Sequence, residues 1–231
     1  MSSSSQGLVI PSYLTRTYWW AYVHPRAVSL FERQWLVNLI LWGNFARLRD
    51  AALDALGLGT AARTLQIACV YGDLTPRLVA RLAPGAQLDV VDVLPIQLKN
   101  LAAKLPAPDA ATLICADSTA LPSASAYYDR ALLFFLLHEQ PEEARRRTLA
   151  EALRVVRPGG KLIIVDYHRP HALHPLILPM AAILGTLEPF ALDLWRHEIT
   201  QWLPAELPAT AISKRTLFGG LYQLITIAVP E

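Results

Sequence analysis

Three polar or flexible residues of the sequence each follow an apolar run that predicts a β-strand: Gly72, Asp92 and Asp117. An acid after the second strand of a nucleotide-binding fold can accept hydrogen bonds from both ribose hydroxyls. An acid after the third strand could accept one from the exocyclic amine of adenine. A glycine before a helix lets a carboxylate, such as that of methionine, approach the helix N-terminus. Taken singly, each acid is better explained as a loop or cap residue, but the ordered set predicts an adenosyl ligand with an amino-acid end.

Alternating elements must position these residues. From about residue 64 onward, apolar runs alternate with helical periodicity, which predicts parallel strands joined by crossover helices. We expect strands over 64–70, 87–91, 112–115, 130–135 and 161–165, and helices over 76–82, 96–104 and 141–156. Thr75 is the expected N-cap of the first of these helices, the turn at Pro158-Gly159-Gly160 precedes the fifth strand, and Gly219-Gly220 predicts a C-terminal antiparallel hairpin. Because ligands bind outside the carboxyl ends of parallel strands, the first three loops should share one site.

Composition excludes several classes of protein. The formal net charge of +2 and the pI near 8.6 are too small for a nucleic-acid-binding surface. The run Arg145 to Arg147 has acidic neighbours and is expected to be a solvated helix face. Cys69 and Cys115 both lie in apolar, strand-like runs, so neither a disulfide framework nor a thiolate metal site is expected. These features favour a reducing, cytoplasmic location.

The N-terminal quarter differs from the rest in composition. Residues 1–7 predict a disordered, Ser-rich tail without the features of a signal peptide. Residues 8–57 are apolar, aromatic and helical, and they predict a lid or substrate-entry segment ahead of an α/β domain over 58–231. Ordinary packing of these helices on the sheet explains the pattern equally well. Residues 172–187 are apolar but interrupted by prolines, which favours a soluble or interfacial segment over a membrane span.

Two segments carry a family resemblance. Residues 64–75 (TLQIACVYGDLT) and 153–166 (LRVVRPGGKLIIVD) resemble the ubiquinone and menaquinone C-methyltransferases. The similarity covers about residues 60–230. It implies a Rossmann-like α/β fold of the class I methyltransferase type, with a mostly parallel seven-stranded sheet, and a polyprenyl quinone as the substrate. It also implies S-adenosylmethionine (SAM) as cofactor, held by Gln66, Val70, Tyr71, Gly72, Asp92, Val93, Asp117 and Ser118.

The first motif departs from the pattern of that group. Gln66 stands where an acid is usual, and Cys69-Val70-Tyr71-Gly72 replaces the usual Gly-Gly-Thr-Gly loop. Together with residues 17–22 (TYWWAY) and 31–44 (FERQWLVNLILWGN), these departures are similar to the family of rhodoquinone biosynthesis proteins over nearly the whole chain. That resemblance implies conversion of ubiquinone to rhodoquinone, in which an amino group replaces a ring methoxy group. It further implies SAM as the amino donor, a requirement for manganese, and peripheral association with the inner membrane.

The missing acid has a chemical interpretation. An α-amino group titrates at about 7.7–8.0, so it can be a nucleophile near neutral pH if nothing holds it protonated. A carboxylate would favour the ammonium form, whereas the amide of Gln66 would not. A tolerated polar residue at a strand end is the simpler alternative. On the amino-transfer hypothesis Gln66, Tyr71 and His138 are the expected catalytic residues, with Tyr71 packed on the methionine chain or the quinone ring.

Candidate metal ligands follow the fourth and fifth expected strands: His138, Glu139, Asp166 and His168. Imidazole and carboxylate ligands suit manganese, which would act as a Lewis acid on a quinone carbonyl. A hydrogen-bonded polar loop explains each residue equally well. Two other functions also remain open, namely conventional methyl transfer to a quinone or phenol, and non-catalytic binding of a quinone or lipid.

Overall fold

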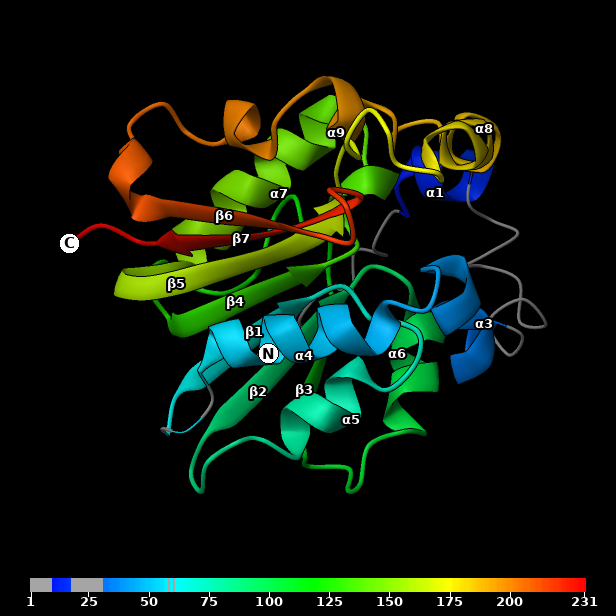
Figure 1. The fold of residues 1–231 in the computed structure, drawn as a ribbon. Helices are drawn as coiled ribbons and strands as arrows, with labels where there is room; N and C mark the ends of the chain where they lie inside the picture. The colour runs from blue at the N-terminus through cyan, green and yellow to red at the C-terminus, as the bar shows by residue number, and fades with distance from the viewer. Residues whose placement is uncertain (1–9, 18–30, 58, 60) are drawn as a thin grey trace.

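A central sheet organises the chain. The computed structural model describes residues 10–17, 31–57, 59 and 61–231; the tail expected over 1–7 and the aromatic run 18–22 lie outside these residues. The described part forms one seven-stranded sheet in the order β3-β2-β1-β4-β5-β7-β6 (Figure 1). Its strands are β1 (Arg63–Ile67), β2 (Gln87–Asp92), β3 (Thr112–Cys115), β4 (Tyr128–Phe134), β5 (Val156–Tyr167), β6 (Ile212–Leu217) and β7 (Tyr222–Ala228).

The pairing confirms the fold class predicted from the sequence. Strands β1 to β5 pair in parallel, whereas β7 runs antiparallel to both β5 and β6. In β1 and β4 nearly every residue is buried, which is the pattern of a parallel sheet covered on both faces. The result is a mostly parallel sheet closed by a C-terminal antiparallel hairpin.

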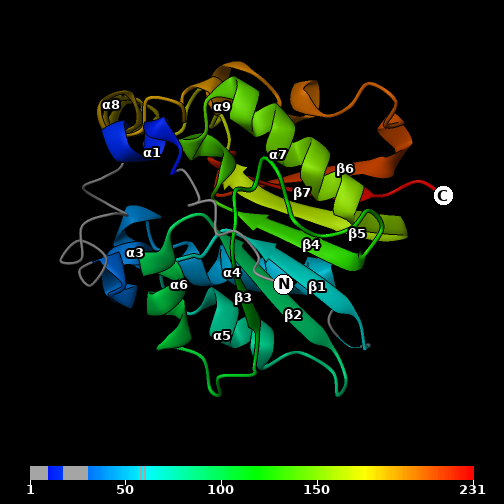
Figure 2. The same cartoon turned by 180° about the vertical axis from the view of Figure 1, so that it is seen from behind.

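Helices cover both faces of this sheet. Helices α4 (Phe45–Leu56) and α5 (Leu74–Val79) lie on one face, and α7 (Glu142–Val155) lies on the other (Figures 1 and 2). Helix α6 (Pro95–Ala102) packs against β2 and β3. Because α4 contacts β4, β5 and β7 and buries Phe45, Leu48 and Leu53, it forms part of the core of the α/β unit.

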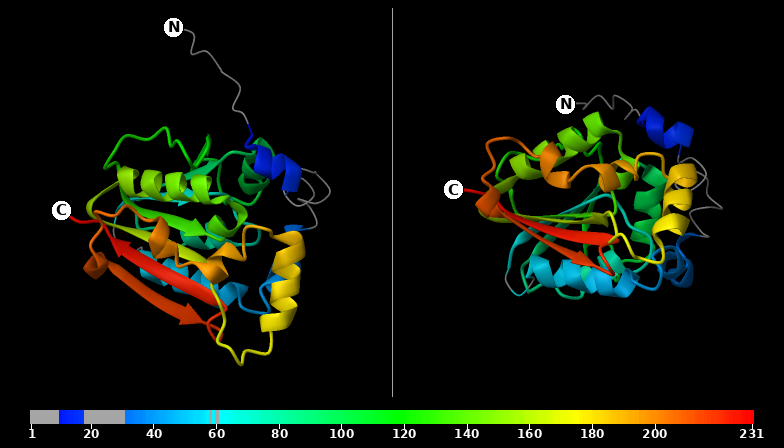
Figure 3. Two further views of the ribbon diagram at one scale, coloured as in Figure 1. Left: turned by 90° about the horizontal axis from the view of Figure 1, so that it is seen from above. Right: turned by 45° about the horizontal axis from the view of Figure 1, so that its top comes forward.

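Further helices gather at one end of the molecule. Helices α1 (Ser12–Thr17), α3 (Gln34–Ile40) and α8 (Ile177–Leu187) lie at the end toward which the parallel strands point (Figures 1 and 3). The remaining short elements are α9 (Asp193–Arg196) and the 3-10 turns η2 (Leu137–Glu139), η3 (Ile199–Trp202) and η4 (Ala209–Ala211). Within the described ranges, no helix has the length and apolar character needed to cross a bilayer.

Two local predictions were wrong. The strand expected over 64–70 ends at Ile67, because Ala68 turns the backbone to a φ of 73°. Helix α5 therefore starts early, at Leu74, and Thr75 is not its N-cap but a buried residue whose hydroxyl donates to Gln66. The turn expected at 158–160 lies within β5 as an irregularity of the strand, where the register to β4 shifts, Gly159 has a φ of 72°, and Gly159 and Gly160 exchange backbone hydrogen bonds with Val229.

Candidate active site

A cavity of about 630 Å³ lies at the carboxyl ends of the parallel strands. Its walls come from the segments that follow β1 to β5 and from helices α3 and α8. Most of the lining is apolar, and its polar members are Tyr13, Tyr71, Asp92, Gln97, Asp117, Ser118, His138, Glu139, Tyr167 and Glu188. Asp92, Asp117 and Ser118 lie in the loops after β2 and β3, and we call this part the cofactor end. The part around His138, α3 and α8 is the substrate end.

Asp92 is placed to bind a diol. Its Oδ2 accepts the Cys69 N–H at 2.7 Å and its Oδ1 accepts the Leu94 N–H at 2.8 Å. A carboxylate has about four acceptor positions, so both oxygens retain capacity for ribose hydroxyls. Burial raises the pKa of Asp92 to about 6, and the hydrogen bonds from Leu94 and Cys69 offset part of that rise. Asp92 is therefore mainly ionised at neutral pH.

Asp117 and Ser118 complete the cofactor end, and both line the cavity as expected. Asp117 Oδ1 accepts the Thr119 N–H at 2.8 Å, so this acid also stabilises its own loop. The Ser118 hydroxyl is hydrogen-bonded to Thr148 Oγ1 at 2.9 Å and accepts from Gln140 Nε2 at 3.0 Å. These contacts tie the loop after β3 to helix α7.

The loop after β1 divides into residues that line the cavity and residues that support it. Val70 and Tyr71 line the cavity, as does Val93 after β2. The Tyr71 hydroxyl accepts a hydrogen bond from Gln97 Nε2 at 2.8 Å. Gly72 is not among the lining residues. Its φ is 81°, and a Cβ there would lie 2.9 Å from Phe45 Cζ, so the glycine is required by packing on α4.

His138 and Asp166 form a buried pair at the substrate end. His138 Nδ1 lies 2.9 Å from Asp166 Oδ1, and His138 lines the cavity. Asp166 is inaccessible to solvent and also accepts the backbone N–H groups of Leu137 and Tyr167. Burial lowers the pKa of His138, but the Asp166 carboxylate outweighs it and holds that pKa above its usual value. The pair therefore presents an imidazolium to the cavity at neutral pH.

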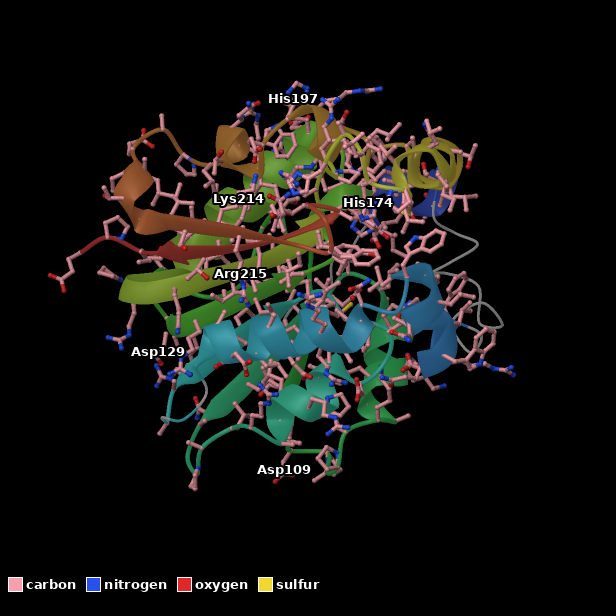
Figure 4. The ribbon with its side chains drawn as sticks, viewed as in Figure 1. Asp109, Asp129, His174, His197, Lys214 and Arg215 are labelled. Atoms are coloured by element: carbon pink, nitrogen blue, oxygen red, sulfur yellow. The ribbon has the colours of Figure 1, made fainter. Side chains whose placement is uncertain are left out.

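The four expected metal ligands are not assembled into one site. His138, Glu139 and Asp166 lie near one another, but His168 is not among the cavity residues. His168 Nδ1 faces the Gly220 carbonyl at 2.8 Å, and its Nε2 lies 2.9 Å from Nζ of Lys214 on β6 (Figure 4). Among the described residues, no group of three or more His, Cys, Asp or Glu side chains is arranged to hold a metal ion. The expected manganese site therefore does not fit this part of the chain.

Helices α3 and α8 supply the apolar walls of the substrate end. Leu36, Val37, Leu39, Ile40, Leu41 and Trp42 line it on one side, and Met180, Ile183, Leu184 and Leu187 line it on the other. The two walls meet where Trp42 Nε1 approaches Met180 Sδ at 2.9 Å. Neither wall carries a charged residue at these positions, so this end is suited to an apolar group.

Comparison with known proteins identifies the family. Demethylmenaquinone methyltransferase of Renibacterium salmoninarum is 30% identical over 207 residues, which are 81% of this chain and 83% of that protein. The chain belongs to this methyltransferase family. Residues 64–160 also match the family described as methyltransferase domain. A ubiquinone/menaquinone biosynthesis C-methyltransferase of Syntrophotalea carbinolica is 32% identical over 136 residues, and the match spans 56% of its length.

Solved structures show the same fold at low sequence identity. The Bradyrhizobium japonicum N-methyltransferase NodS, solved with S-adenosylhomocysteine, has a TM-score of 0.55 at 15% identity, covering 80% of this chain and 87% of that one. Human N-acetylserotonin methyltransferase, solved with SAM, has a TM-score of 0.64 at 12% identity, covering 96% of this chain and 61% of that one. These similarities establish the class I methyltransferase fold.

The cofactor end fits SAM, the cofactor of the family. Asp92 and Asp117 place carboxylate oxygens at the cavity, which are the kind of acceptor that ribose hydroxyls and an adenine amine need, and Val93 and Leu94 form an apolar wall beside them. Val70 and Tyr71 of the loop after β1 line the same cavity. Of the eight residues expected to hold SAM, six line the cavity and two, Gln66 and Gly72, support it from behind.

Gln66 occupies the position of the missing acid without reaching the cavity surface. Its side chain is fully buried. Oε1 accepts the Thr75 hydroxyl at 3.0 Å, and Nε2 donates to the Ala68 carbonyl at 3.0 Å. A carboxylate could keep the first of these hydrogen bonds but not the second, because it has no proton to donate. The amide thus stabilises the positive φ of Ala68, which directs the loop toward the cavity.

Arg145 is a site residue that the sequence did not reveal. It was expected on a solvated face with Arg146 and Arg147, and those two do pair with Glu142 and Glu143 at the surface. Arg145, in contrast, is completely buried. Its guanidinium donates to the carbonyls of Leu137, Gln140 and Phe190 and stacks over Trp202 at 4.1 Å. It thereby fixes both ends of the turn that carries His138.

Proposed function

We propose that this chain transfers a methyl group from SAM to the ring of a lipid-soluble quinol. One observation carries the proposal: a single cavity joins Asp92 and Asp117 to an apolar chamber whose charged lining residues are His138, which is paired with Asp166, and the acids Glu139 and Glu188. Two relatives support the same substrate class by their names, one a demethylmenaquinone methyltransferase and the other a C-methyltransferase of ubiquinone and menaquinone biosynthesis.

The residues of the substrate end suggest how the ring is activated. A quinol ring attacks the methyl group efficiently only as its phenolate, which is electron-rich. The imidazolium of His138 would donate a hydrogen bond to the ring oxygen and stabilise the negative charge there, and Asp166 would keep the imidazole oriented. The carbon–methyl bond then forms as the sulfur–methyl bond breaks. Glu139, on the same wall, is placed to take the hydroxyl proton as the phenolate forms and to return it to the product, and the proton that the ring carbon loses is released as the one net proton of the reaction.

Amino transfer to ubiquinone is the second candidate, and Gln66 is the observation that favours it. The side chain at the end of β1 is a neutral amide, so it places no negative charge beneath the loop that faces the cavity and does not favour the ammonium form of a SAM amine bound there. The amine of SAM would form the new carbon–nitrogen bond as the methoxy group leaves as methanol. The α-carbon of SAM would then lose its proton and be oxidised to an imine while the quinone ring takes up the two electrons, and water would hydrolyse the imine, which leaves the amino group on the ring and releases SAM as its α-keto acid. On this hypothesis Gln66→Asp should slow amination most at neutral pH, and higher pH should restore part of the rate.

One assay separates the two reactions. Purified protein is incubated with a short-chain demethylmenaquinol or ubiquinone and with SAM that carries a heavy-carbon methyl group or a heavy-nitrogen amine. Methyl transfer yields S-adenosylhomocysteine and a product heavier by one labelled methyl unit. Amination yields a product that is lighter than the quinone substrate and carries the nitrogen label of SAM. Parallel reactions with and without manganese show whether the metal matters, and the absence of any product would favour a binding role.

We further propose that the substrate enters from a membrane. Large apolar side chains are exposed on α3 and α8 beside the chamber: Trp35 and Leu39 are 60% and 63% exposed, and Leu178 is 79% exposed. A lipid-dissolved quinol could pass from the bilayer into the chamber without crossing water. Flotation with liposomes should carry the protein upward, and the double variant Leu39→Glu/Leu178→Glu should stay at the bottom.

Tyr127→Glu provides the matched control, because Tyr127 is also an exposed large apolar residue but lies beside the amino-terminal end of β4. If this control floats with the liposomes and the double variant does not, the result supports docking through α3 and α8. Failure of the wild-type protein to float, with or without quinone, would exclude direct docking.

A further inference from the structure

Glu32 binds the outer side of the loop that follows β1. Its Oε1 accepts the Gly72 N–H at 3.1 Å and the Lys104 ammonium at 2.7 Å, and its Oε2 accepts Asn100 Nδ2 at 2.7 Å. The Glu32 and Lys104 side chains are about one-fifth exposed. A partly buried ion pair with hydrogen bonds to both carboxylate oxygens is better defined than a surface pair.

Lys104 connects this carboxylate to the backbone of the same loop. Besides Glu32, its ammonium donates to the carbonyls of Val70 at 3.2 Å and Gly72 at 3.0 Å. These two carbonyls flank Tyr71, which lines the cavity together with Val70. A change in the conformation of residues 70–72 would therefore move both the hydrogen-bond acceptors of Lys104 and the N–H that binds Glu32.

Neighbouring residues reinforce the contact. Phe31 stacks on Tyr71 with ring centroids 5.9 Å apart and itself lines the cavity. Gln34 Nε2 donates to Asp73 Oδ1 at 3.2 Å, and that carboxylate is held in turn by Arg49 at 2.6 Å. Residues 31–34, here called the strap, thus contact the loop after β1, here called the cofactor loop, at Tyr71, Gly72 and Asp73. The strap leads directly into α3, the apolar wall of the substrate end.

We infer that Glu32 and Lys104 are positioning residues that couple SAM binding to closure of the substrate chamber. SAM stabilises the conformation of residues 70–72 that Lys104 and Glu32 recognise. The strap then holds Phe31 and the start of α3 against the cavity. Because coupling is reciprocal, a strap that is held down must also strengthen SAM binding. The inference depends on SAM as the cofactor but not on the identity of the acceptor.

Proteolysis at Arg33 measures the state of the strap directly. Arg33 is exposed, but the side chains of Glu32 and Gln34 are bound to the loop after β1, and the Arg33 carbonyl accepts the N–H groups of Leu36 and Val37. Trypsin should therefore cut after Arg33 mainly when the strap is released. The full-length protein is digested with and without saturating SAM, and the peptide ending at Arg33 is followed by mass spectrometry. SAM should slow this cleavage in the wild-type protein by about tenfold or more, as expected for a ligand that favours the closed state.

Lys104→Met should reduce the ratio of the cleavage rates without and with SAM to near one, and it should weaken SAM binding measured by calorimetry. Glu32→Gln should act in the same direction and provides a second test if Lys104→Met folds poorly. Lys99→Met, on the exposed side of α6, is the matched control and should keep the wild-type ratio. A general loss of stability would speed cleavage in both conditions and leave the ratio unchanged.

Two results would overturn the inference. The first is that SAM binds the wild-type protein but does not change the rate of cleavage after Arg33. The other is a folded Lys104→Met or Glu32→Gln variant that retains the wild-type ratio at saturating SAM. Neither result depends on a quinone, so failure of the proposed methyl transfer remains a separate outcome.

Discussion

The two ends of the cavity are built in different ways. At the cofactor end, Asp92 is the last residue of β2 and Asp117 follows β3, and each carboxylate accepts a backbone N–H from two residues further along the chain, Leu94 and Thr119. At the substrate end, the walls come from α3 and α8, which lie far apart in the chain, and Arg145 connects the turn around His138 to Phe190. The first end follows from strand topology, whereas the second depends on long-range packing.

This difference indicates where specificity resides. A cofactor shared by a whole family requires the same acceptors at the same strand ends, and the sheet provides them. An acceptor that differs among relatives is accommodated by segments outside the sheet, which can change without disturbing it. Substitutions at the two ends should therefore affect different measured quantities, and four predictions test that separation.

The largest effect is expected for His138→Ala. Loss of the imidazolium should lower kcat by about 10²–10⁴-fold, the usual contribution of a positioned acid or base, and leave the Kd for SAM nearly unchanged. The measurement is a steady-state assay with calorimetric SAM titration. His168→Ala is the matched control, since that histidine follows the neighbouring strand β5 but lies outside the cavity. A fully active His138→Ala protein would contradict the role of the pair.

Asp92→Ala should affect binding. Removal of a charged acceptor for the ribose hydroxyls should weaken SAM binding by about 1.5–3 kcal/mol. Asp109→Ala, on a surface loop before β3, should leave the affinity unchanged (Figure 4). Unchanged SAM affinity in a folded Asp92→Ala protein would show that Asp92 does not bind SAM. It would also contradict the proposed difference between the two ends of the cavity.

Gln66→Glu tests the support beneath the cofactor loop. The new carboxylate can still accept the Thr75 hydroxyl, but it faces the Ala68 carbonyl without a proton to donate. We expect a loss of about 1–3 kcal/mol in the free energy of unfolding, the cost of an unsatisfied buried polar group. Because burial favours the protonated acid, the loss should be smaller at pH 5 than at pH 8 in urea titrations. Equal stability at both pH values would show that the amide is not required there.

The smallest effect concerns pH. The pKa of Asp92 is raised to about 6 by burial, so the carboxylate gains a proton as the pH falls from 7 to 5, and SAM affinity should fall with it. The native state binds more protons than the unfolded chain between about pH 4 and 6, so this group makes the fold less stable as pH rises through that window. Asp92→Asn should bind SAM with little dependence on pH. A wild-type affinity that is constant from pH 5 to 7 would contradict the assignment.

Strand-end chemistry could be predicted because it is local. Asp92 and Asp117 follow apolar runs in the sequence, and the sheet necessarily brings those run ends together. The pairing of His138 with Asp166 could also have been predicted, because the neighbouring strands β4 and β5 place both residues at one edge of the sheet. Their predicted role as metal ligands shows that residue types alone do not distinguish a hydrogen-bonded pair from a coordination site.

Other features could not be read from the sequence. Glu32 and Lys104 are 72 residues apart, and no periodicity relates them. Arg145 belongs to a run of three arginines whose charge pattern predicts solvent exposure, and only the packing of η3 and the 190 region over α7 buries it. Gly72 was expected to admit a ligand, but the ring of Phe45 takes that space.

The buried guanidinium of Arg145 also has a consequence for unfolding. Arginine cannot lose its charge at any ordinary pH, so it cannot remain in the interior unless its carbonyl partners remain there too. The turn around His138 and the segment at Phe190 therefore cannot detach one at a time without leaving a buried cation poorly solvated. Arg145 thus makes the turn around His138 and the segment at Phe190 a single cooperative unit, whose backbone amides should exchange with solvent together.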